Sequence, residues 1–327
     1  MEIAMGGAAL VIKPRKTPVS FRHFDALIRR LEVRHPLVWQ VQQDYDNAKA
    51  GFAGEESLDF QLSLLRPAEH YILHQVRLQV NEHVFEIDTL IVYSNMIVIL
   101  EVKNFSGRLD FCDELGQLVQ HRSKEEPRAL RYPMSQLERQ QLLLREWLAK
   151  HFPQKIEVHG FVVLVNRASI VQGGDLIDGL VRADKLPFVL NRLALVERKL
   201  RLEAVDQKRL AMKIAGACKE PYVDLVEWYA IESEYIRGGV YCSSCKSWHV
   251  ERLRDRWCCK SCGHVDKDMH KEVLRDYQLL FGNVITCKEA CRWLGLKKGT
   301  CLKLLKDISE PTSLSRKKVY YSLKSLT

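Results

Sequence analysis

Residues 86–103 form two runs rich in β-branched side chains around the dipeptide Ser94-Asn95. Two such runs around a two-residue connection are typical of a β-hairpin, and Asn tolerates the positive φ that tight hairpin turns need. With this turn, Tyr93 faces Met96 and the numbers of paired residues sum to 189. The segment therefore predicts two antiparallel strands in a fixed register, within a sheet that is buried along most of its length.

Charged residues interrupt this apolar hairpin at one end. The predicted register places Asp88 opposite Glu101 and Glu86 opposite Lys103, with Glu101 and Lys103 on the same face as Asp88. Opposed carboxylates repel each other in a half-buried sheet unless a cation lies between them. The alternative is an exposed ion-pair face on an edge hairpin, which a one-residue shift of register would favour.

The residue types of this patch suit metal-assisted hydrolysis. Mg²⁺ takes oxygen ligands from one or two carboxylates and keeps several waters, one of which can act as a nucleophile. Lys103 follows the second carboxylate, Glu101, by two residues. Its ammonium group can orient that water or stabilise negative charge on a phosphate.

The spacing of Asp88, Glu101 and Lys103 resembles the PD-(D/E)XK nuclease signature, and the longer sequence is similar to a NERD (nuclease-related) domain over residues 50–167. The matching segments are Gly51 with Gly54-Glu55 at a helix start, Ile87-Asp88, Ile99 to Gly107, Pro133 followed by Gln136, and the apolar strand Gly160 to Asn166. The resemblance implies an α/β fold, with a restriction-endonuclease-like mixed sheet flanked by helices.

The resemblance also implies roles for individual residues. Asp88 and Glu101 would bind Mg²⁺ or Mn²⁺, and Lys103 would be the catalytic lysine. Glu55 would be a helix-borne acid that positions metal or water, with the acid directly after it as an alternative. Gln136 would contact the substrate near the scissile phosphate, although without the family it is equally well an exposed helix residue.

Four of the ten cysteines have the spacing of a zinc ribbon: Cys242-x₂-Cys245, thirteen residues, then Cys259-x₂-Cys262. Each Cys-x-x-Cys turn offers two thiolates, and a structural Zn²⁺ takes four in a tetrahedron. Disulfides are the competing interpretation. Cys258 and His264 are alternative ligands, and the remaining cysteines are expected to be ordinary buried thiols: Cys112, Cys218, Cys287, Cys291 and Cys301.

The positive charge of the chain lies at its C-terminal end. Residues 238–327 hold 18 Lys and Arg against 9 Asp and Glu, whereas the rest of the chain balances at 32 of each. A basic appendage on a neutral domain suggests a polyanionic partner, with a solvated basic face as the alternative. Trp248, Trp257 and the arginines between the cysteine pairs would either contact nucleic acid or supply the ribbon's core.

A short helix capped by Thr286, a turn at Leu294-Gly295-Leu296 and a lysine-bearing helix from Thr300 to Ile308 resemble a helix-turn-helix. A strand over Val319 to Leu323 would form a β-wing. A helical bundle used for packing or dimerisation is the alternative.

These features predict five consecutive parts: a helical lead-in (1–49, with 1–19 unstructured), a nuclease-related domain (50–167), a helical extension (168–237), a zinc ribbon (238–265) beginning at a Gly238-Gly239 linker, and a basic helix-turn-helix-like module (266–327). Within the second part, a helix over 55–65 is expected to follow a flexible stretch at 51–54.

The sequence as a whole favours a Mg²⁺-dependent hydrolase that processes DNA. The alternative is a non-catalytic nucleic-acid-binding or interaction protein that retains a nuclease-like fold. No apolar run approaches the length that spans a bilayer, and no secretory signal stands at the start of the sequence, so we expect a cytoplasmic protein.

Overall fold

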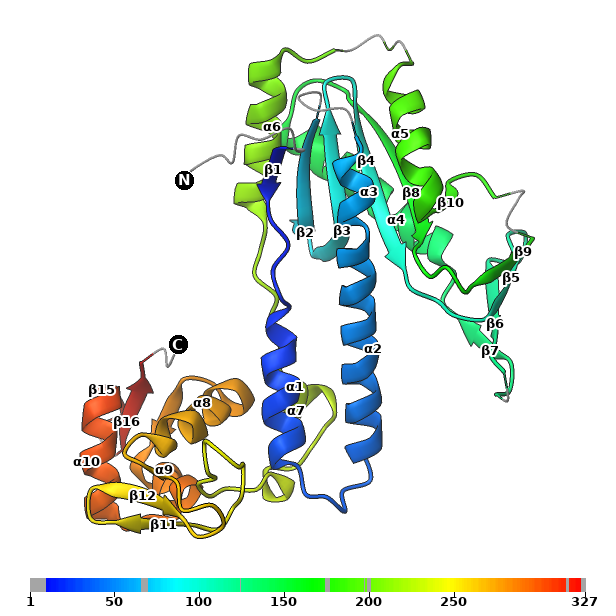
Figure 1. Ribbon diagram of the computed structural model, residues 1–327. Helices are drawn as coiled ribbons and strands as arrows, with labels where there is room; N and C mark the ends of the chain where they lie inside the picture. The colour runs from blue at the N-terminus through cyan, green and yellow to red at the C-terminus, as the bar shows by residue number, and fades with distance from the viewer. Residues whose placement is uncertain are drawn as a thin grey trace. The chain divides into compact units, whose positions relative to one another are not determined.

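The computed structural model describes residues 10–65, 70–123, 125–173, 177–196, 198, 201–315 and 318–324. The chain divides into two compact units (Figure 1). We call them the sheet unit (Met1–Pro18 and Asn47–Pro221) and the C-terminal unit (Val19–Asp46 and Tyr222–Thr327). Within the described ranges, no helix combines the length and hydrophobicity that crossing a membrane requires.

The sheet unit is built around a six-stranded mixed sheet in the order β1-β2-β3-β4-β8-β10. Its strands are β1 (Leu10–Lys13), β2 (His70–Val80), β3 (His83–Tyr93), β4 (Met96–Lys103), β8 (Glu157–Leu164) and β10 (Leu180–Arg182). Strands β2, β3 and β4 are antiparallel, whereas β8 runs parallel to both β4 and β10. The predicted α/β fold with a mixed sheet is confirmed.

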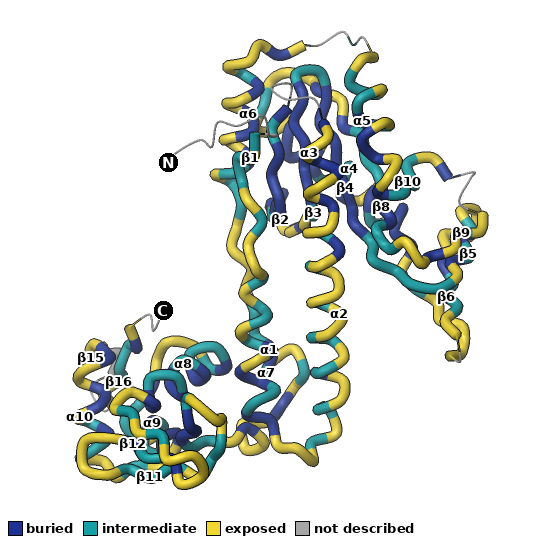
Figure 2. The backbone as a smooth tube through the Cα atoms, viewed as in Figure 1, coloured by how far each residue is buried: buried dark blue, intermediate teal, exposed yellow. Residues whose placement is uncertain are grey.

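The predicted hairpin register is also confirmed. Strand β3 ends at Tyr93 and β4 begins at Met96, and the pairs run from Val92–Ile97 to Thr89–Leu100. Figure 2 shows these central strands as largely buried. Branched apolar side chains on both faces explain this, because a sheet covered on both sides needs no polar alternation.

Helices cover both faces of this sheet (Figure 1). On one face, Val92 and Ile97 pack in a core with residues of α4 (Pro133–His151) and α6 (Ala204–Ala217). On the other face, Ile91 and Val98 share a core with residues of α3 (Asp59–Ser63) and α5 (Leu186–Ala194). Helix α4 begins at Pro133, as expected from the fixed φ of Pro at a first helical position.

A second sheet of four short strands lies in the same unit, in the order β7-β6-β5-β9. Its strands are β5 (Arg108–Cys112), β6 (Gln117–His121), β7 (Arg128–Leu130) and β9 (Ile170–Gln172). Residues 168–237, expected to be helical, therefore include strands β9 and β10 besides the short helix η2 (Ala183–Lys185) and helices α5 and α6.

Two expectations for the N-terminal part are wrong. Residues 10–13, expected to be unstructured, form β1, which pairs in parallel with β2. Residues 51–54, expected to be flexible, lie inside the continuous helix α2 (Val38–Ser57). Glu55 is consequently near the C-terminal end of a helix rather than at its start.

The C-terminal unit combines α1 (Val19–Arg30) with α7 (Leu225–Trp228), η3 (Ser233–Tyr235) and α8 (Met269–Phe281). At its centre, the buried Arg30 donates to Asp276 on α8 over 2.7 Å. Gly238 and Gly239, expected to form a linker, lie inside this unit, and the division between the units falls instead after Pro221.

The ribbon strands are β11 (Val250–Leu253), β12 (Arg256–Cys259) and β13 (Val265–Asp266), which form one antiparallel sheet. After α8 come β14 (Val284–Thr286), α9 (Cys287–Leu294), α10 (Lys298–Ile308), β15 (Ser309–Ser315) and β16 (Lys318–Leu323). Thr286 and Glu289 form the predicted capping box, and Gly295 ends α9 with a φ of 65°. The expected wing strand is present as β16, paired with β14 and β15.

Candidate functional site

Among the predicted residues of the nuclease-like site, Glu101 is deeply enclosed, with 2% of its surface exposed. Its Oε1 accepts hydrogen bonds from Lys103 Nζ at 2.5 Å and from Gln136 Nε2 at 2.7 Å. Its Oε2 accepts one from Gln140 Nε2 at 2.6 Å. A carboxylate offers about four lone-pair sites. Glu101 is therefore fixed by three donors, and its Oε2 retains a free lone pair.

Gln136 and Gln140 come from successive turns of α4, which places both amides over β4. Gln136 also accepts from Lys103 Nζ at 3.0 Å, so one amide holds the lysine and the carboxylate together. Helix α4 can pack closely against β8 because the residue of β8 that faces it is a glycine. A Cβ on Gly160 would lie 2.6 Å from Leu137 Cδ1.

Asp88 lies at the point where the ladder between β3 and β4 stops. The last backbone pair of this ladder is Thr89–Leu100, and the Asp88 carboxylate accepts the backbone N–H of Val102 at 2.7 Å. The prediction that Asp88 pairs directly with Glu101 is therefore wrong, although the register leading to it is right. The pairing between β2 and β3 is interrupted at the same point, where Gln75 has a φ of 51° opposite Asp88.

Asp88 keeps a little surface in contact with solvent, but protein atoms crowd its carboxylate from nearly all sides. This desolvation raises the pKa of Asp88 well above its ordinary value, and the charges of Glu101 and Glu55 raise it further. The Val102 N–H and the Lys103 ammonium oppose that shift. Negative charge at Asp88 is thus poorly compensated by the protein alone.

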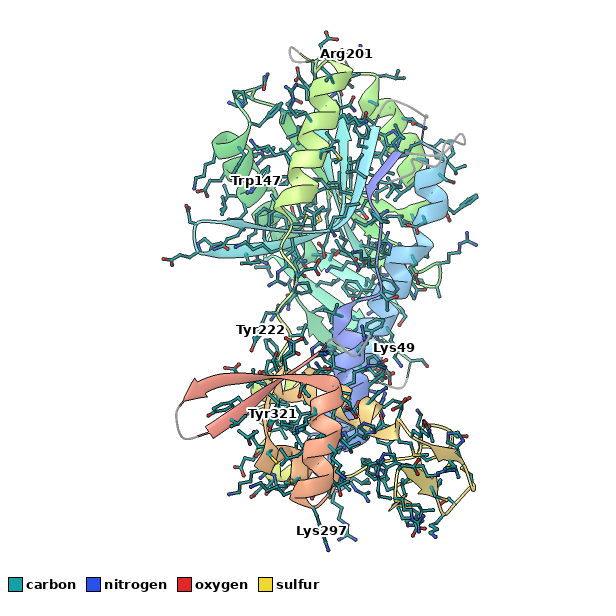
Figure 3. All side chains as sticks on the ribbon, turned by 90° about the vertical axis from the view of Figure 1, so that its left-hand side faces the viewer. Lys49, Trp147, Arg201, Tyr222, Lys297 and Tyr321 are labelled. Carbon is teal, nitrogen blue, oxygen red and sulfur yellow. The ribbon has the colours of Figure 1, made fainter. Side chains whose placement is uncertain are left out.

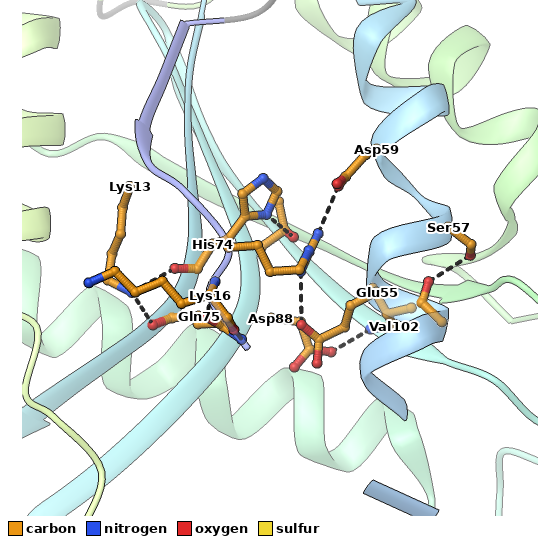
Figure 4. Close-up of polar contacts among 12 residues, drawn as sticks. Lys13, Lys16, Glu55, Ser57, Asp59, His74, Gln75, Asp88 and Val102 are labelled. Carbon is orange, nitrogen blue, oxygen red and sulfur yellow. Dashed lines mark hydrogen bonds and ion pairs between the residues drawn. The ribbon is translucent and has the colours of Figure 1, made fainter. Parts of the chain in front are cut away.

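Glu55 reaches the same region from α2, and Figure 4 shows its contacts. Arg15 Nη1 donates to Glu55 Oε2 at 2.8 Å, and Arg15 Nη2 donates to Asp59 at 3.0 Å. Burial raises the pKa of Glu55, the ion pair with Arg15 opposes this, and the charge of Glu101 adds to it. The alternative acid Glu56 is exposed, so the contacts favour Glu55.

The position of Glu55 depends on the glycine before it. A Cβ on Gly54 would lie 2.8 Å from the Cβ of Asn104, which follows β4 directly. The Asn104 amide in turn donates to the carbonyl of Ala50 at 2.8 Å. Helix α2 and the end of β4 therefore touch at Gly54, and this contact brings Glu55 towards Asp88 and Glu101.

The Glu86 side chain points away from Lys103, although its backbone carbonyl accepts from Gln140 Nε2 at 2.8 Å. It is exposed and forms an ion pair with Arg77, its partner across β2 and β3, instead of facing Lys103 as the hairpin register predicted. Sequence reasoning also missed two residues of the site, Arg15 and Gln140. Gln140 stands four residues after Gln136, a spacing that places both on one helix face, whereas no local signal marks Arg15.

The residues that meet here suit a divalent cation. Glu55, Asp88 and Glu101 offer hard oxygen ligands, and their mutual repulsion raises the pKa of Asp88. Among the described residues, three or more ligand atoms lie within 4.8 Å of one another only in two groups of cysteines. The three carboxylates are therefore spaced more widely than ligand atoms on one ion, so at least one of them would act through water or after a side-chain adjustment.

The four predicted ribbon cysteines come together in the C-terminal unit, with all Sγ atoms within 4.8 Å of one another. The Cys242–Cys262 and Cys245–Cys259 Sγ separations are 3.7 and 3.6 Å. Ligands at 2.3 Å from a tetrahedral Zn²⁺ stand about 3.8 Å apart, so the quartet fits a closed zinc site.

The alternative ribbon ligands lie outside this quartet. Cys258 alternates with Cys259 along β12 and therefore points to the other face of that strand. His264 instead approaches Ser243, with Nε2 at 3.1 Å from its hydroxyl.

Comparison with known proteins gives one family. Residues 50–165 match the model of the nuclease-related domain (NERD), which confirms the resemblance over that range. The crystal structure of protein VC1899 from Vibrio cholerae is 13% identical over 50% of this chain and 36% of that chain, with a TM-score of 0.22. That score is too low to indicate a shared fold. No curated protein matches the sequence.

Proposed function

From a chain that carries a nuclease-related domain at residues 50–165, we propose a divalent-cation-dependent nuclease that hydrolyses phosphodiester bonds, with DNA as the substrate. The observation that carries the proposal is the enclosed carboxylate of Asp88. The charges with the largest effect on its pKa are those of Glu101 and Glu55. A carboxylate cluster of this kind is stable when a cation shares it.

In this proposal Asp88 and Glu101 bind Mg²⁺ or Mn²⁺, which would supply a polarised water and Lewis-acid stabilisation of the phosphate. Glu55 orients the water from the side of α2. Lys103, held at Glu101 by Gln136, places its ammonium group where negative charge develops on the phosphate. Gln136 is then a positioning residue as well as a neighbour of the substrate.

In this proposal, the C-terminal unit supplies the surface that binds nucleic acid. A groove of about 790 Å³ runs between the ribbon, α8 and α10. Three aspartates line it, against seven basic side chains: Arg252, Arg254, Lys267, Lys271, Arg275, Lys303 and Lys324. A basic groove beside a helix-turn-helix-like pair suits a phosphate backbone.

The tryptophans of the ribbon serve its core in this scheme. Trp257 is buried, and the guanidinium of Arg252 stacks on its ring at 4.8 Å. Zn²⁺ at Cys242, Cys245, Cys259 and Cys262 is structural, because four thiolates leave no open position for a substrate.

We retain the segments 50–167, 238–265 and 266–327 as the catalytic, ribbon and helix-turn-helix-like parts of this proposal. Cytoplasmic residence goes with it, because all ten cysteines are free thiols and a reducing compartment preserves them.

A non-catalytic binding protein is the second candidate. The observation that favours it is the occupation of Glu101 by three donors together with the wide spacing of the carboxylates. Such a site would keep its shape without holding a metal tightly.

The test is a cleavage assay with Mg²⁺ on single-stranded DNA, double-stranded DNA and RNA, using the full chain. We expect cleavage of DNA by the wild type, and losses of roughly a thousandfold in Glu101→Gln and Lys103→Met, as for removal of a dominant electrostatic group. Glu146→Gln, at an exposed ion pair on α4, is the control that should retain full activity. Nucleic-acid binding without cleavage in all four proteins would favour the second candidate.

A further inference from the structure

Three cysteines that are far from the ribbon quartet in sequence meet in the C-terminal unit. Cys287 is the first residue of α9, Cys291 lies one turn later, and Cys301 belongs to α10. Their three Sγ atoms lie within 4.8 Å of one another, and those of Cys287 and Cys291 are 4.0 Å apart. The three cysteines are therefore neighbours in space, although they are scattered along the sequence.

The spacing of this trio resembles that of the ribbon quartet. The Cys245–Cys259 and Cys242–Cys262 Sγ separations in the quartet are 3.6 and 3.7 Å, close to the roughly 3.8 Å between thiolates on one tetrahedral Zn²⁺. A separation of 4.0 Å between Cys287 and Cys291 needs only a small rotamer adjustment to reach that value. The trio is thus arranged for one mononuclear ion.

Two of the three cysteines stand near helix starts. Cys287 is in the first turn of α9, where backbone N–H groups favour negative sulfur, and Cys301 is the fourth residue of α10. Lys298 opens α10, directly after Lys297, which is labelled in Figure 3.

The three cysteines differ in burial, and an ion can reach them from the exposed side. Cys301 is fully buried at the base of the trio, whereas Cys287 and Cys291 are partly exposed. Three thiolates leave a tetrahedral ion one open position, on the exposed side, which a water molecule can fill.

We propose that Cys287, Cys291 and Cys301 form a second site for a thiophilic divalent cation, Zn²⁺ in the cell. An ion there links α9 to α10 across the Gly295 turn and fixes the angle between the two helices. The site stands independently of the proposed nuclease activity, because it rests on sulfur geometry alone.

The experiment measures zinc per chain by elemental analysis in the full-length protein, purified without chelators. We expect about two zinc ions in the wild type and about one in the double variant Cys287→Ser, Cys291→Ser. The matched control is Cys112→Ser with Cys218→Ser, two partly exposed thiols outside both groups, and it should keep both ions. One zinc in the wild type, unchanged in the double variant, would overturn the proposal.

A second measurement needs no variant and so does not depend on folding of the mutant. Cys112, Cys218, Cys287 and Cys291 have the same intermediate exposure. In the zinc-bound wild type, we expect iodoacetamide to label Cys287 and Cys291 several times more slowly than Cys112 and Cys218, as read by mass spectrometry. Equal labelling rates at the four thiols would contradict a bound ion.

Discussion

Two enclosed aspartates, one in each unit, differ in the charges that surround their carboxylates. Asp276 in the C-terminal unit is 3% exposed and accepts from Arg29 Nη1 at 2.5 Å and from Arg30 Nε at 2.7 Å. Arg30 also donates to two backbone carbonyls of the same unit. The negative charge of Asp276 is therefore balanced by arginines of the protein itself, in a structural ion pair.

Asp88 in the sheet unit has the opposite surroundings. One backbone N–H binds its carboxylate, and the charges that act most strongly on it are those of Glu101 and Glu55. Since an uncompensated buried charge is unfavourable by several kcal/mol, our proposal has this site completed by an ion from solution. On that proposal, Asp276 holds the fold together and Asp88 serves chemistry.

The largest expected effect is on stability, and the two isosteric variants should differ in it. Asp276→Asn leaves the fully buried Arg30 without a counter-charge, and we expect the free energy of unfolding of the C-terminal unit to fall by about 3–5 kcal/mol. Asp88→Asn removes repulsion and should leave the sheet unit at least as stable as before. Hydrogen exchange resolved by peptide under increasing urea reports on each unit separately, and equal losses would remove the distinction.

A second effect concerns how the carboxylates are brought together. Gly54→Ala puts a Cβ 2.8 Å from that of Asn104 and should push Glu55 away, with a loss of roughly 1–3 kcal/mol in stability. Gly51→Ala, one turn earlier in α2, has nothing within 4 Å of the added Cβ and should stabilise the helix by about 0.5–1 kcal/mol.

Cleavage rates and urea midpoints for both variants provide the measurement. Gly54→Ala should lose activity, while Gly51→Ala should keep it. Identical behaviour of the two variants would mean that the close approach at Gly54 does not position the site.

The smallest effect is the pH dependence of stability without metal. The pKa of Asp88 is raised in the folded state, so the folded protein binds the proton more tightly than the unfolded chain. The resulting stability is present below the ordinary Asp pKa and is lost as pH rises through the folded pKa. The free energy of unfolding of Asp88→Asn relative to wild type should therefore increase with pH across that window.

Urea unfolding of chelator-treated wild type and Asp88→Asn at a series of pH values measures this slope. Saturating Mg²⁺ should abolish it, because a bound cation replaces the proton as the counter-charge. A difference between the two proteins that does not change with pH would mean that the Asp88 charge is compensated without metal.

Local patterns in the sequence predicted much of the fold and part of the site. The hairpin register followed from a two-residue turn and two apolar runs, and the Thr286 cap and the Cys-x-x-Cys pairs are equally local signals. Lys103 and Glu101 meet because they are two residues apart on one strand. These features depend on neighbours in sequence, so a single sequence contains them.

The features that were missed depend on distant contacts. Both ladders that flank Asp88 are interrupted beside it, and on β2 the backbone of Gln75 takes a positive φ there. Arg15 reaches Glu55 from a segment without any helix or strand pattern of its own, and the cysteine trio forms only when α9 packs against α10. The spacing of residues along the sequence does not indicate such long-range contacts.

The central claim is that Asp88 is completed by a cation from solution, and calorimetric titration of Mn²⁺ or Mg²⁺ into the full chain tests it most directly. Wild type and Glu146→Gln should bind one hard cation per sheet unit, and Asp88→Asn should show no binding at that site. If Asp88→Asn binds the ion as tightly as wild type, or if wild type binds none, the acidic surroundings of Asp88 are structural and the account is wrong.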